Sequence, residues 1–282
     1  MIRLPAVSPD TIEQARAGSL AAIDEIIVLL QPGLYNLAVR MLGHREDARD
    51  ACQEILLKVV THLGGFRGEA AFGTWVFQIA RNHLMRTATR ARETPEVSFE
   101  ALSDRLAQGL AITARDDPAS LTPEDKAAAR EIALGCTQAM TMILDRQHRL
   151  AWLLGIVFGL DSDEAAAVVG ITPAAYRQRL SRARRDLQSF MEGQCGLVSD
   201  RAACRCERQV RPARLAGAKP GLPLADSRER AQVTRSFETL VRMGDAATVF
   251  RAHPEYSRPE AMILAIRSVL RSEGFWDEHN AS

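Results

Sequence analysis

The chain has 282 residues, enough for about two ordinary domains that each bury a core. Its 36 basic and 35 acidic residues give a formal charge of +1, so a surface for nucleic acid must come from local clustering of charge. The first ten residues lack the apolar core of a signal peptide, and the later apolar run at 150–160 is too short to span a bilayer. We therefore expect a cytoplasmic protein without membrane insertion.

Helical spacing of apolar residues recurs almost everywhere, which predicts an all-α fold. A first helical block covers residues 10–92, and Pro32-Gly33 and Gly43 are predicted to interrupt its early helices. Its strongest helix is predicted over 45–63, and after a loop a further helix follows over 74–90. The apolar face of the first of these helices consists of Ala48, Ala51, Cys52, Ile55, Val59 and Leu63.

The loop before the second helix, residues 66–75, combines aromatic, small and charged residues. Arg81, Arg86, Arg90 and Arg92 follow along the helix and its exit. Unpaired bases need stacking surfaces and phosphates need cations, so this region is a candidate platform for single-stranded DNA. Trp75 itself is predicted to pack in the core, the commoner place for an apolar residue in a helix.

Residues 93–122 mix Pro, Ser and Asp with scattered apolar positions, which predicts a flexible linker. A second helical block follows over 123–192. In it, Asp161 and Glu164 form a capping box, and Gly170 is the residue type that ends a helix in the left-handed conformation. Thr172-Pro173 then begins another helix, so the segment predicts a helix-turn-helix.

The second helix of this motif is rich in arginine, and Tyr176, Leu180, Ala183 and Leu187 recur at helical spacing on its core side. A basic run alone would suit a solvated surface helix. With both caps and the turn in register, we favour binding in a DNA groove. Ala174 and Ala175 offer only methyl contacts, which leaves Arg177 and Gln178 as the best candidates for hydrogen bonds to base edges.

Residues 193–282 form an extension with a cysteine cluster, Cys195, Cys204 and Cys206. Three thiols are candidate ligands of a structural Zn²⁺, although no fourth ligand is evident nearby. The alternatives are a redox sensor, with Arg201, Arg205 and Arg208 lowering a thiol pKa, or plain structural cysteines. Cys52 and Cys136 are predicted to pack within helices.

Two final helices are predicted over 228–243 and 258–272. Their amphipathic pattern would let these helices fold back on either block. We hypothesise that they regulate, within the same chain, the block on which they pack.

The segments 46–54, 66–70 and 74–82 resemble conserved region 2 of the extracytoplasmic-function (ECF) sigma factors, and 144–149 with 170–184 resembles their region 4. The resemblance covers residues 10–192. It implies a region 2 domain over 10–92 that binds core RNA polymerase and opens the −10 element, and a region 4 domain over 123–192 that binds the −35 element.

Residue roles follow from the same resemblance. The polymerase-binding positions are Asp47, Asp50, Gln53 and Glu54, which would meet the coiled coil of the largest subunit. The −10 positions are Phe66, Arg67, Phe72, Thr74, Arg81, Asn82 and Arg86. The −35 positions are Thr172, Ala174, Ala175, Arg177, Gln178, Arg179 and Arg182. An apolar surface at 152–158 would meet the polymerase flap.

The resemblance implies a transcription initiation factor that is not an enzyme and requires no cofactor. The sequence agrees, because it contains no phosphate-cradling glycine loop, no HExxH and no GxSxG. Core polymerase and promoter DNA are the implied partners, and an anti-sigma factor is a further candidate. The alternative is a helix-turn-helix regulator that binds duplex DNA without acting as a sigma subunit.

Overall fold

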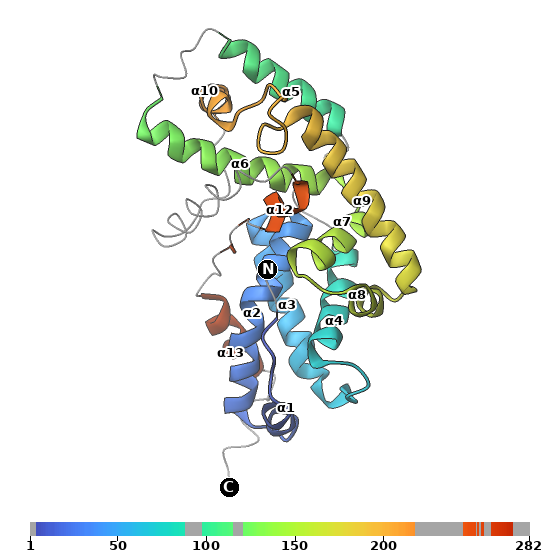
Figure 1. Cartoon of the computed structure of the whole chain (residues 1–282). Coiled ribbons are helices and arrows are strands. Elements are labelled where there is room, and N and C mark those ends of the chain that lie inside the picture. The colour runs from blue at the N-terminus through green and yellow to red at the C-terminus, as the bar shows by residue number, and fades with distance from the viewer. Residues whose placement is uncertain are drawn as a thin grey trace. The chain divides into compact units, whose positions relative to one another are not determined.

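The computed structural model describes residues 4–87, 98–114, 121–217, 245–251, 253, 255–256 and 261–272. These residues form helices and, beyond them, one isolated β-bridge between Cys195 and Cys204 (Figure 1). The all-α prediction is therefore confirmed. The chain forms two compact units, one mainly of residues 94–152 and 178–255, the other of 2–93, 153–177 and 256–282. One boundary between the units, at 93/94, lies close to the bound predicted at 92, whereas the predicted bounds at 122 and 192 fall inside one unit and further boundaries fall at 152/153 and 177/178.

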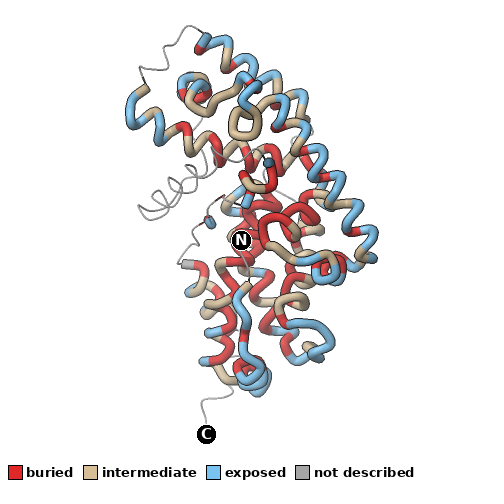
Figure 2. Tube along the Cα trace, in the orientation of Figure 1, coloured by how far each residue is buried: buried red, intermediate tan, exposed pale blue. Residues whose placement is uncertain are grey.

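The unit that contains the N-terminal block is built around two packed helices. Its described helices are α1 (Pro9–Arg16), α2 (Leu20–Leu42), α3 (Arg45–Thr61), α4 (Phe72–Arg86), α8 (Ser162–Val169) and α13 (Ala261–Ser272). Helix α2 packs against α1 and α3, and α4 packs against both α3 and α8. Figure 2 shows buried positions along α2 and α3, where apolar faces at helical spacing meet.

Helix α2 runs through Pro32 and Gly33, so the predicted interruption there is wrong. A proline inside a helix is destabilising by about 3 kcal/mol, but α2 is buried along most of its length, and the core packing outweighs that term. A Cβ at Gly33 would lie 2.6 Å from Leu4 Cδ2, so glycine lets the N-terminal segment approach the helix. Gly43 ends the helix at φ 72°, as predicted.

Length and composition alone would allow α2 to cross a membrane, but most of its apolar stretch is buried within the fold. It is the central core helix of its unit.

The described part of the other unit consists mainly of helices. Its described elements include α5 (Phe99–Ile112), α6 (Pro123–Ile143), α7 (Arg146–Trp152), η4 (Cys206–Gln209), α10 (Val210–Leu215) and α12 (Ala246–Arg251). Most of α9 (Pro173–Gln194) also belongs to it. The short 3₁₀ helix η4 packs on α5, α6 and α10.

Helix α5 lies within the predicted linker, so a flexible tether is a wrong description of that part. Ser98 caps the helix, its Oγ accepting a hydrogen bond from Ala101 N at 3.1 Å. Phe99 packs on Phe190 at a ring-centroid distance of 4.9 Å, and Leu106 O accepts from Gln209 Nε2 at 3.0 Å. These partners lie some 90 or more residues away along the chain, which is why local composition did not reveal them.

The segment 152–158 is not the exposed apolar surface that the sequence suggested. Trp152 ends α7, and one π-helical turn, η3 (Leu153–Val157), follows it. Trp152 and Phe158 are both fully buried, and the rest of the run is nearly so. A run this apolar serves as core in the described structure, and the expected contact surface for the polymerase flap is absent from it.

The predicted helix at 258–272 is observed as α13, whereas the one at 228–243 lies outside the described residues. Chain near α13 folds back on α2: Asn36 Oδ1 accepts from Tyr256 N at 2.7 Å, and the Arg40 guanidinium lies 4.5 Å above the Tyr256 ring. Arg267 makes two 2.7 Å bonds to the carboxylate of Asp24. The fold-back of the extension onto the first block is thus observed for these residues.

Candidate nucleic-acid interface

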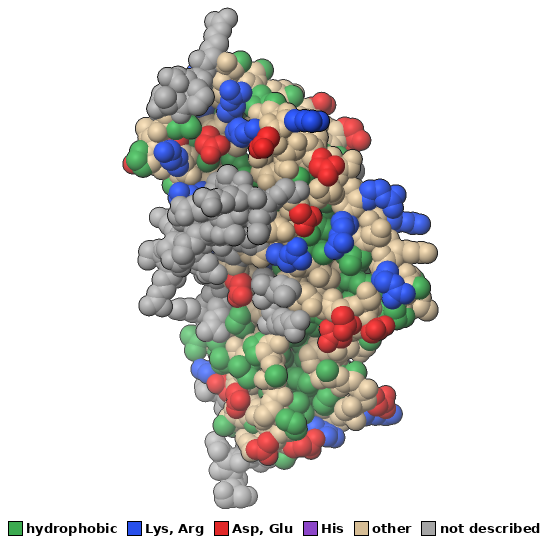
Figure 3. Space-filling view, viewed as in Figure 1, with side chains coloured by type: hydrophobic (Ala, Val, Ile, Leu, Met, Phe, Trp, Pro, Cys, Tyr) green, Lys and Arg blue, Asp and Glu red, His purple; other side chains and the backbone are tan. Residues whose placement is uncertain are grey.

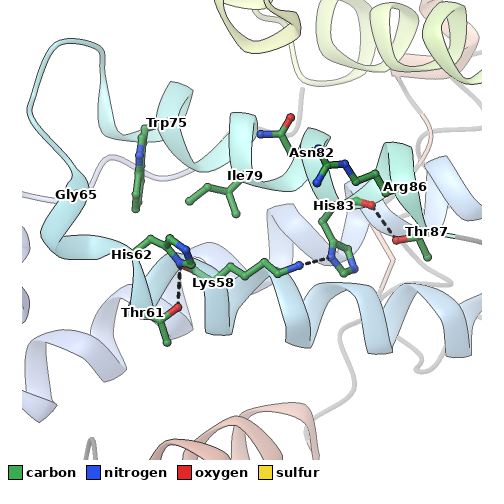
Figure 4. A pocket seen from close by; sticks show the side chains of 10 residues that line it. All are labelled: Lys58, Thr61, His62, Gly65, Trp75, Ile79, Asn82, His83, Arg86 and Thr87. Atoms are coloured by element: carbon green, nitrogen blue, oxygen red, sulfur yellow. Dashed lines mark hydrogen bonds between the residues drawn. The ribbon is translucent and has the colours of Figure 1, made fainter.

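A pocket of about 810 Å³ lies between the end of α3 and the exposed face of α4 (Figure 4). Figure 4 shows side chains from both helices lining it, with the ring of Trp75 at one end, Ile79 near the middle and polar groups at the other positions. The lining residues are Lys58, Thr61, His62, Gly65, Trp75, Ile79, Asn82, His83, Arg86 and Thr87. Cationic, aromatic and hydrogen-bonding groups thus converge on one opening.

Three aromatic rings fix the entrance of α4. Phe66 contacts Phe72 edge-on at 5.2 Å and Trp75 at 5.5 Å, and Phe72 stacks on Trp75 at 5.6 Å between ring centroids. Phe72 is buried, while Trp75 is only half-buried and forms part of the pocket wall. The prediction of Trp75 as a core residue is therefore wrong, because Phe72 occupies the core side and leaves one side of the indole to the pocket.

A polar pair forms part of the pocket wall. Lys58 Nζ lies 2.9 Å from His83 Nδ1. Burial, and next the Lys58 ammonium, hold the pKa of His83 below its usual 6.5, while Glu54 opposes them. His83 is therefore neutral at pH 7, and its Nδ1 accepts a hydrogen bond from the ammonium.

The structure brings part of the predicted −10 set together. Asn82 and Arg86 line the pocket, and Asn82 Oδ1 accepts from Arg81 Nη1 at 2.7 Å. Thr74 is half-buried, and Arg67 is exposed on the loop outside the pocket. The predicted set did not include His83 on α4, nor the lining residues at the end of α3 and just after it, Lys58, Thr61 and His62. Their signal was a polar strip in the last turn of a helix that leads into the aromatic loop.

The acidic face of α3 is only partly accessible. Asp47, in the first turn, is only 5% exposed, so its carboxylate is not at the surface of the described structure. His44 Nδ1 lies 3.9 Å from its carboxylate. Asp50 and Gln53 are half-buried and Glu54 is exposed, so three of the four predicted positions reach the surface.

The helix-turn-helix has the predicted caps. Asp161 Oδ1 accepts from Glu164 N at 2.8 Å, and Glu164 Oε2 accepts from Asp161 N at 3.1 Å, completing the capping box. Gly170 has φ 72° and ψ 40°, and Thr172 Oγ1 accepts from Ala175 N at 3.2 Å. Local sequence therefore determined both ends of the turn.

Helix α9 has one buried and one exposed face. Tyr176, Ala183 and Leu187 are fully buried, as predicted, while Leu180 is half-buried. The predicted −35 residues that are exposed are Thr172, Ala174, Ala175, Arg177, Gln178 and Arg182. Arg179 is partly buried, and Figure 3 shows basic side chains along the exposed side of α9. A row of cations with small residues at the helix start can enter a DNA groove.

Helix α8 packs on α4 within one unit, a pairing that sequence reasoning did not anticipate. Gln78 Nε2 donates to Ala167 O at 3.0 Å, and Phe77 meets Phe158 edge-on at 5.5 Å. The first helix of the helix-turn-helix thus covers one face of the helix that carries the pocket.

Comparison with known proteins agrees with this geometry. Residues 26–94 match the family model described as Sigma-70 region 2. The chain is 26% identical over 186 residues to the RNA polymerase sigma-H factor of Pseudomonas aeruginosa, covering 64% of this chain and 92% of that protein. It is 24% identical over 177 residues to the ECF RNA polymerase sigma factor SigW of Bacillus subtilis, a match that covers 63% of this chain and 92% of that protein. It is 26% identical over 186 residues to the ECF RNA polymerase sigma-E factor of Escherichia coli, with 64% of this chain and 92% of that protein covered.

Proposed function

We propose that this chain is a sigma factor of the ECF group, because residues 26–94 match Sigma-70 region 2 and the chain is similar to ECF sigma factors over 177–186 residues. We further propose how its surfaces divide the work of transcription initiation. The first block binds core RNA polymerase and holds an unpaired base of the −10 element in the pocket between α3 and α4. The exposed face of α9 contacts the −35 element. The catalytic chemistry belongs to the polymerase, so this chain acts through binding alone.

The observation that carries the proposal is the pocket of Figure 4. Trp75 offers a ring face for stacking, and Asn82 presents an amide to a base edge. Lys58 and Arg86 supply positive charge for the flanking phosphates. Extruding a base from the duplex costs a few kcal/mol, which stacking and hydrogen bonds in such a pocket can offset.

The accessible acidic residues of α3 supply the polymerase contact. Asp50 and Glu54 lie four positions apart, on one helical face, with Gln53 beside them. Carboxylates on such a face attract a basic partner and increase the rate of association. Arg49 partly neutralises the negative charge of this face, because its guanidinium lies 2.8 Å from the Glu46 carboxylate and 3.4 Å from the Asp50 carboxylate.

For the −35 contact, the supporting feature is the exposed set at the start of α9. Arg177 and Gln178 are the candidates for base edges, and Arg182, more than one turn later, suits a phosphate. The interpretation as a regulator that never acts as a sigma subunit is not favoured, because the similarity to sigma factors covers 177–186 residues, more than either block alone, and 92% of those proteins. A cytoplasmic location follows from this role, and an anti-sigma partner stays a prediction.

Run-off transcription with purified core polymerase tests the proposal. We expect the wild-type chain to start transcripts at a defined subset of a promoter library. Trp75→Ala should reduce open-complex formation by about 10-fold or more, since stacking on an aromatic ring contributes about 1–3 kcal/mol per base. Promoters melted in advance should rescue the variant.

Gln14→Ala, on the exposed side of α1, is the matched control and should behave as wild type. Unchanged promoter opening by Trp75→Ala, or no transcript with the wild-type chain, contradicts the proposal.

A further inference from the structure

Four of the five cysteines converge in the unit that contains α6 and most of α9. Cys136 lies in α6 and Cys195 directly follows α9. Cys204 lies two residues before η4, and Cys206 is the first residue of η4. Helix η4 packs on α6, a β-bridge joins Cys195 to Cys204, and all four residues line one cavity of about 670 Å³. The fifth cysteine, Cys52, is buried in the other unit.

The backbone around the first loop cysteine is folded into a tight turn about its sulfur. Val198 N and Ser199 N both donate to Cys195 O, at 3.1 and 3.0 Å, and Gly196 N donates to Cys204 O at 3.0 Å. A Cβ at Gly196 would lie 2.5 Å from Cys204 O, so only glycine allows this close approach. The turn thereby holds Cys195 and Cys204 next to each other.

Hydrogen-bond donors face two of the sulfur atoms. The backbone N–H groups of Leu197 and Val198 donate to the sulfur of Cys195. Gln209 Nε2 donates to Cys204 Sγ at 3.8 Å. Donors of this kind favour the thiolate over the thiol, and they resemble the outer-shell groups that orient metal-bound ligands.

Positive charge lies near the cluster as well. Arg205 acts on Cys195 and Cys204, and Arg105 acts on Cys136, each favouring the thiolate. Glu207 opposes them at Cys204 and Cys206. Two guanidinium groups thus partly balance the negative charge that several thiolates would bring to one place.

We propose that Cys136, Cys195, Cys204 and Cys206 together bind one Zn²⁺ through four thiolates. Soft sulfur ligands select zinc over the hard cations, and four ligands complete the tetrahedron of a structural site. Cys136 is the fourth ligand that the local spacing of the other three does not reveal. This site is independent of the surfaces assigned to polymerase and promoter.

Metal binding completes the arrangement. In the described part of the chain no three His, Cys, Asp or Glu side chains already stand at metal-binding positions, so the four sulfur atoms turn toward a common centre when zinc binds. Helices η4 and α6 pack together, and the four cysteines already line one cavity, so the backbone brings them to the same place before metal binds. Zinc then fixes the end of α9 to α6.

A redox sensor fits these thiols less well. Burial raises the pKa of all four, to about 11 for Cys204, and neighbouring thiols raise the pKa of Cys136, Cys204 and Cys206 further. The expectation that nearby arginines lower a thiol pKa overall is therefore wrong, because burial outweighs Arg205. Thiols with a raised pKa form few thiolates at neutral pH and react slowly with oxidants. Zinc can still bind these cysteines, because the metal ion displaces the thiol protons and stabilises the thiolates.

The test measures metal in the full chain, purified under reducing conditions without chelator. We expect about one zinc per chain by elemental mass spectrometry. Cys136→Ser should lower the zinc affinity by about 100-fold or more, since even outer-shell changes lower it by about 10–100-fold. Cys52→Ala is the matched control, because it removes a buried cysteine of the other unit, and it should keep its zinc.

A second measurement does not depend on how the variants fold. Metal-free wild type loaded with Co²⁺ should show sulfur-to-cobalt charge-transfer absorption and the strong visible bands of tetrahedral cobalt. Wild type that binds neither metal while its thiols are reduced would overturn the site, as would full zinc retention in Cys136→Ser. Disulfides among the four cysteines in metal-free protein from reducing medium would overturn it too.

Discussion

At the scale of single residues, the pocket between α3 and α4 depends on a neutral histidine. His83 lies beside Lys58, and its pKa is held below the usual 6.5 mainly by burial. The unfolded chain therefore takes up a proton at His83 at higher pH than the folded chain does. The contribution of His83 to the free energy of unfolding is therefore complete above about pH 6.5, the pKa of the unfolded chain. It is lost as the pH falls from there toward the lower pKa of the folded chain.

We predict that acidification from pH 7 to 5 lowers the free energy of unfolding and weakens binding of −10 single strands by the holoenzyme. Protonated His83 would repel Lys58 and open the pocket wall. His83→Gln keeps an acceptor but cannot titrate, so its stability should change less with pH over this range. Urea unfolding at a series of pH values checks this, and equal slopes for variant and wild type would refute the role of His83.

Sequence reasoning at this scale succeeded where a local rule decides and failed where packing decides. The carboxylate of Asp161 and the left-handed Gly170 follow from neighbours three or four residues away. Asp47 and Trp75 did not behave as predicted, because the burial of each depends on a helix packed against it. Spacing on one helix cannot show which face a neighbouring helix covers.

At the scale of elements, the helix-turn-helix depends on its caps. Removing the capping carboxylate in Asp161→Ala should lower the free energy of unfolding by about 1 kcal/mol, since two backbone donors at the start of α8 lose their acceptor. The nearby Asp163→Ala, an exposed first-turn acid that accepts no capping bond in this box, should lower it by only a few tenths. Chemical unfolding monitored by circular dichroism compares the two, and equal losses would count against the cap.

Two helices also differ from what local residue types predicted. Pro32 and Gly33 predicted a break, yet α2 continues because its surroundings bury it. Helix α5 was hidden among polar residues because its partners Phe190 and Gln209 lie far along the chain. A helix that is stabilised by distant contacts leaves only a weak local signal.

At the scale of the whole molecule, the C-terminal extension closes back on the first block through Asn36. Its amide accepts from Tyr256 N and donates to Tyr256 O, at 2.7 and 3.1 Å, and its Oδ1 also accepts from Arg40 Nη1 at 2.7 Å. Asn36→Ala should lower the free energy of unfolding by about 2 kcal/mol, because buried polar groups lose their partners. It should also raise hydrogen exchange in α13 selectively.

Hydrogen exchange read by mass spectrometry distinguishes this effect from a general loosening. Gln14→Ala on α1 serves as the control. Uniform exchange across all helices of the Asn36 variant, with no excess in α13, would show that Asn36 does not hold the extension. If the extension regulates the first block in cis, loss of this contact should release α13 while the other helices of the unit stay folded.

Long-range pairings were beyond sequence reasoning altogether. The packing of α8 on α4, and the approach of Cys136 to the later cysteines, each join segments more than fifty residues apart. The family resemblance supplied the function and the order of the regions, while the contacts between distant segments came from the structure.

The most direct test of the account is the affinity of the purified chain for core RNA polymerase that lacks a sigma subunit. We predict tight binding by the wild-type chain and a loss of at least about 10-fold, or about 1.4 kcal/mol, in the double variant Asp50→Lys/Glu54→Lys. Glu13→Lys, a charge reversal on the exposed side of α1, should bind as wild type does. No association of the wild-type chain with core polymerase, or equal binding by the double variant, would contradict the account.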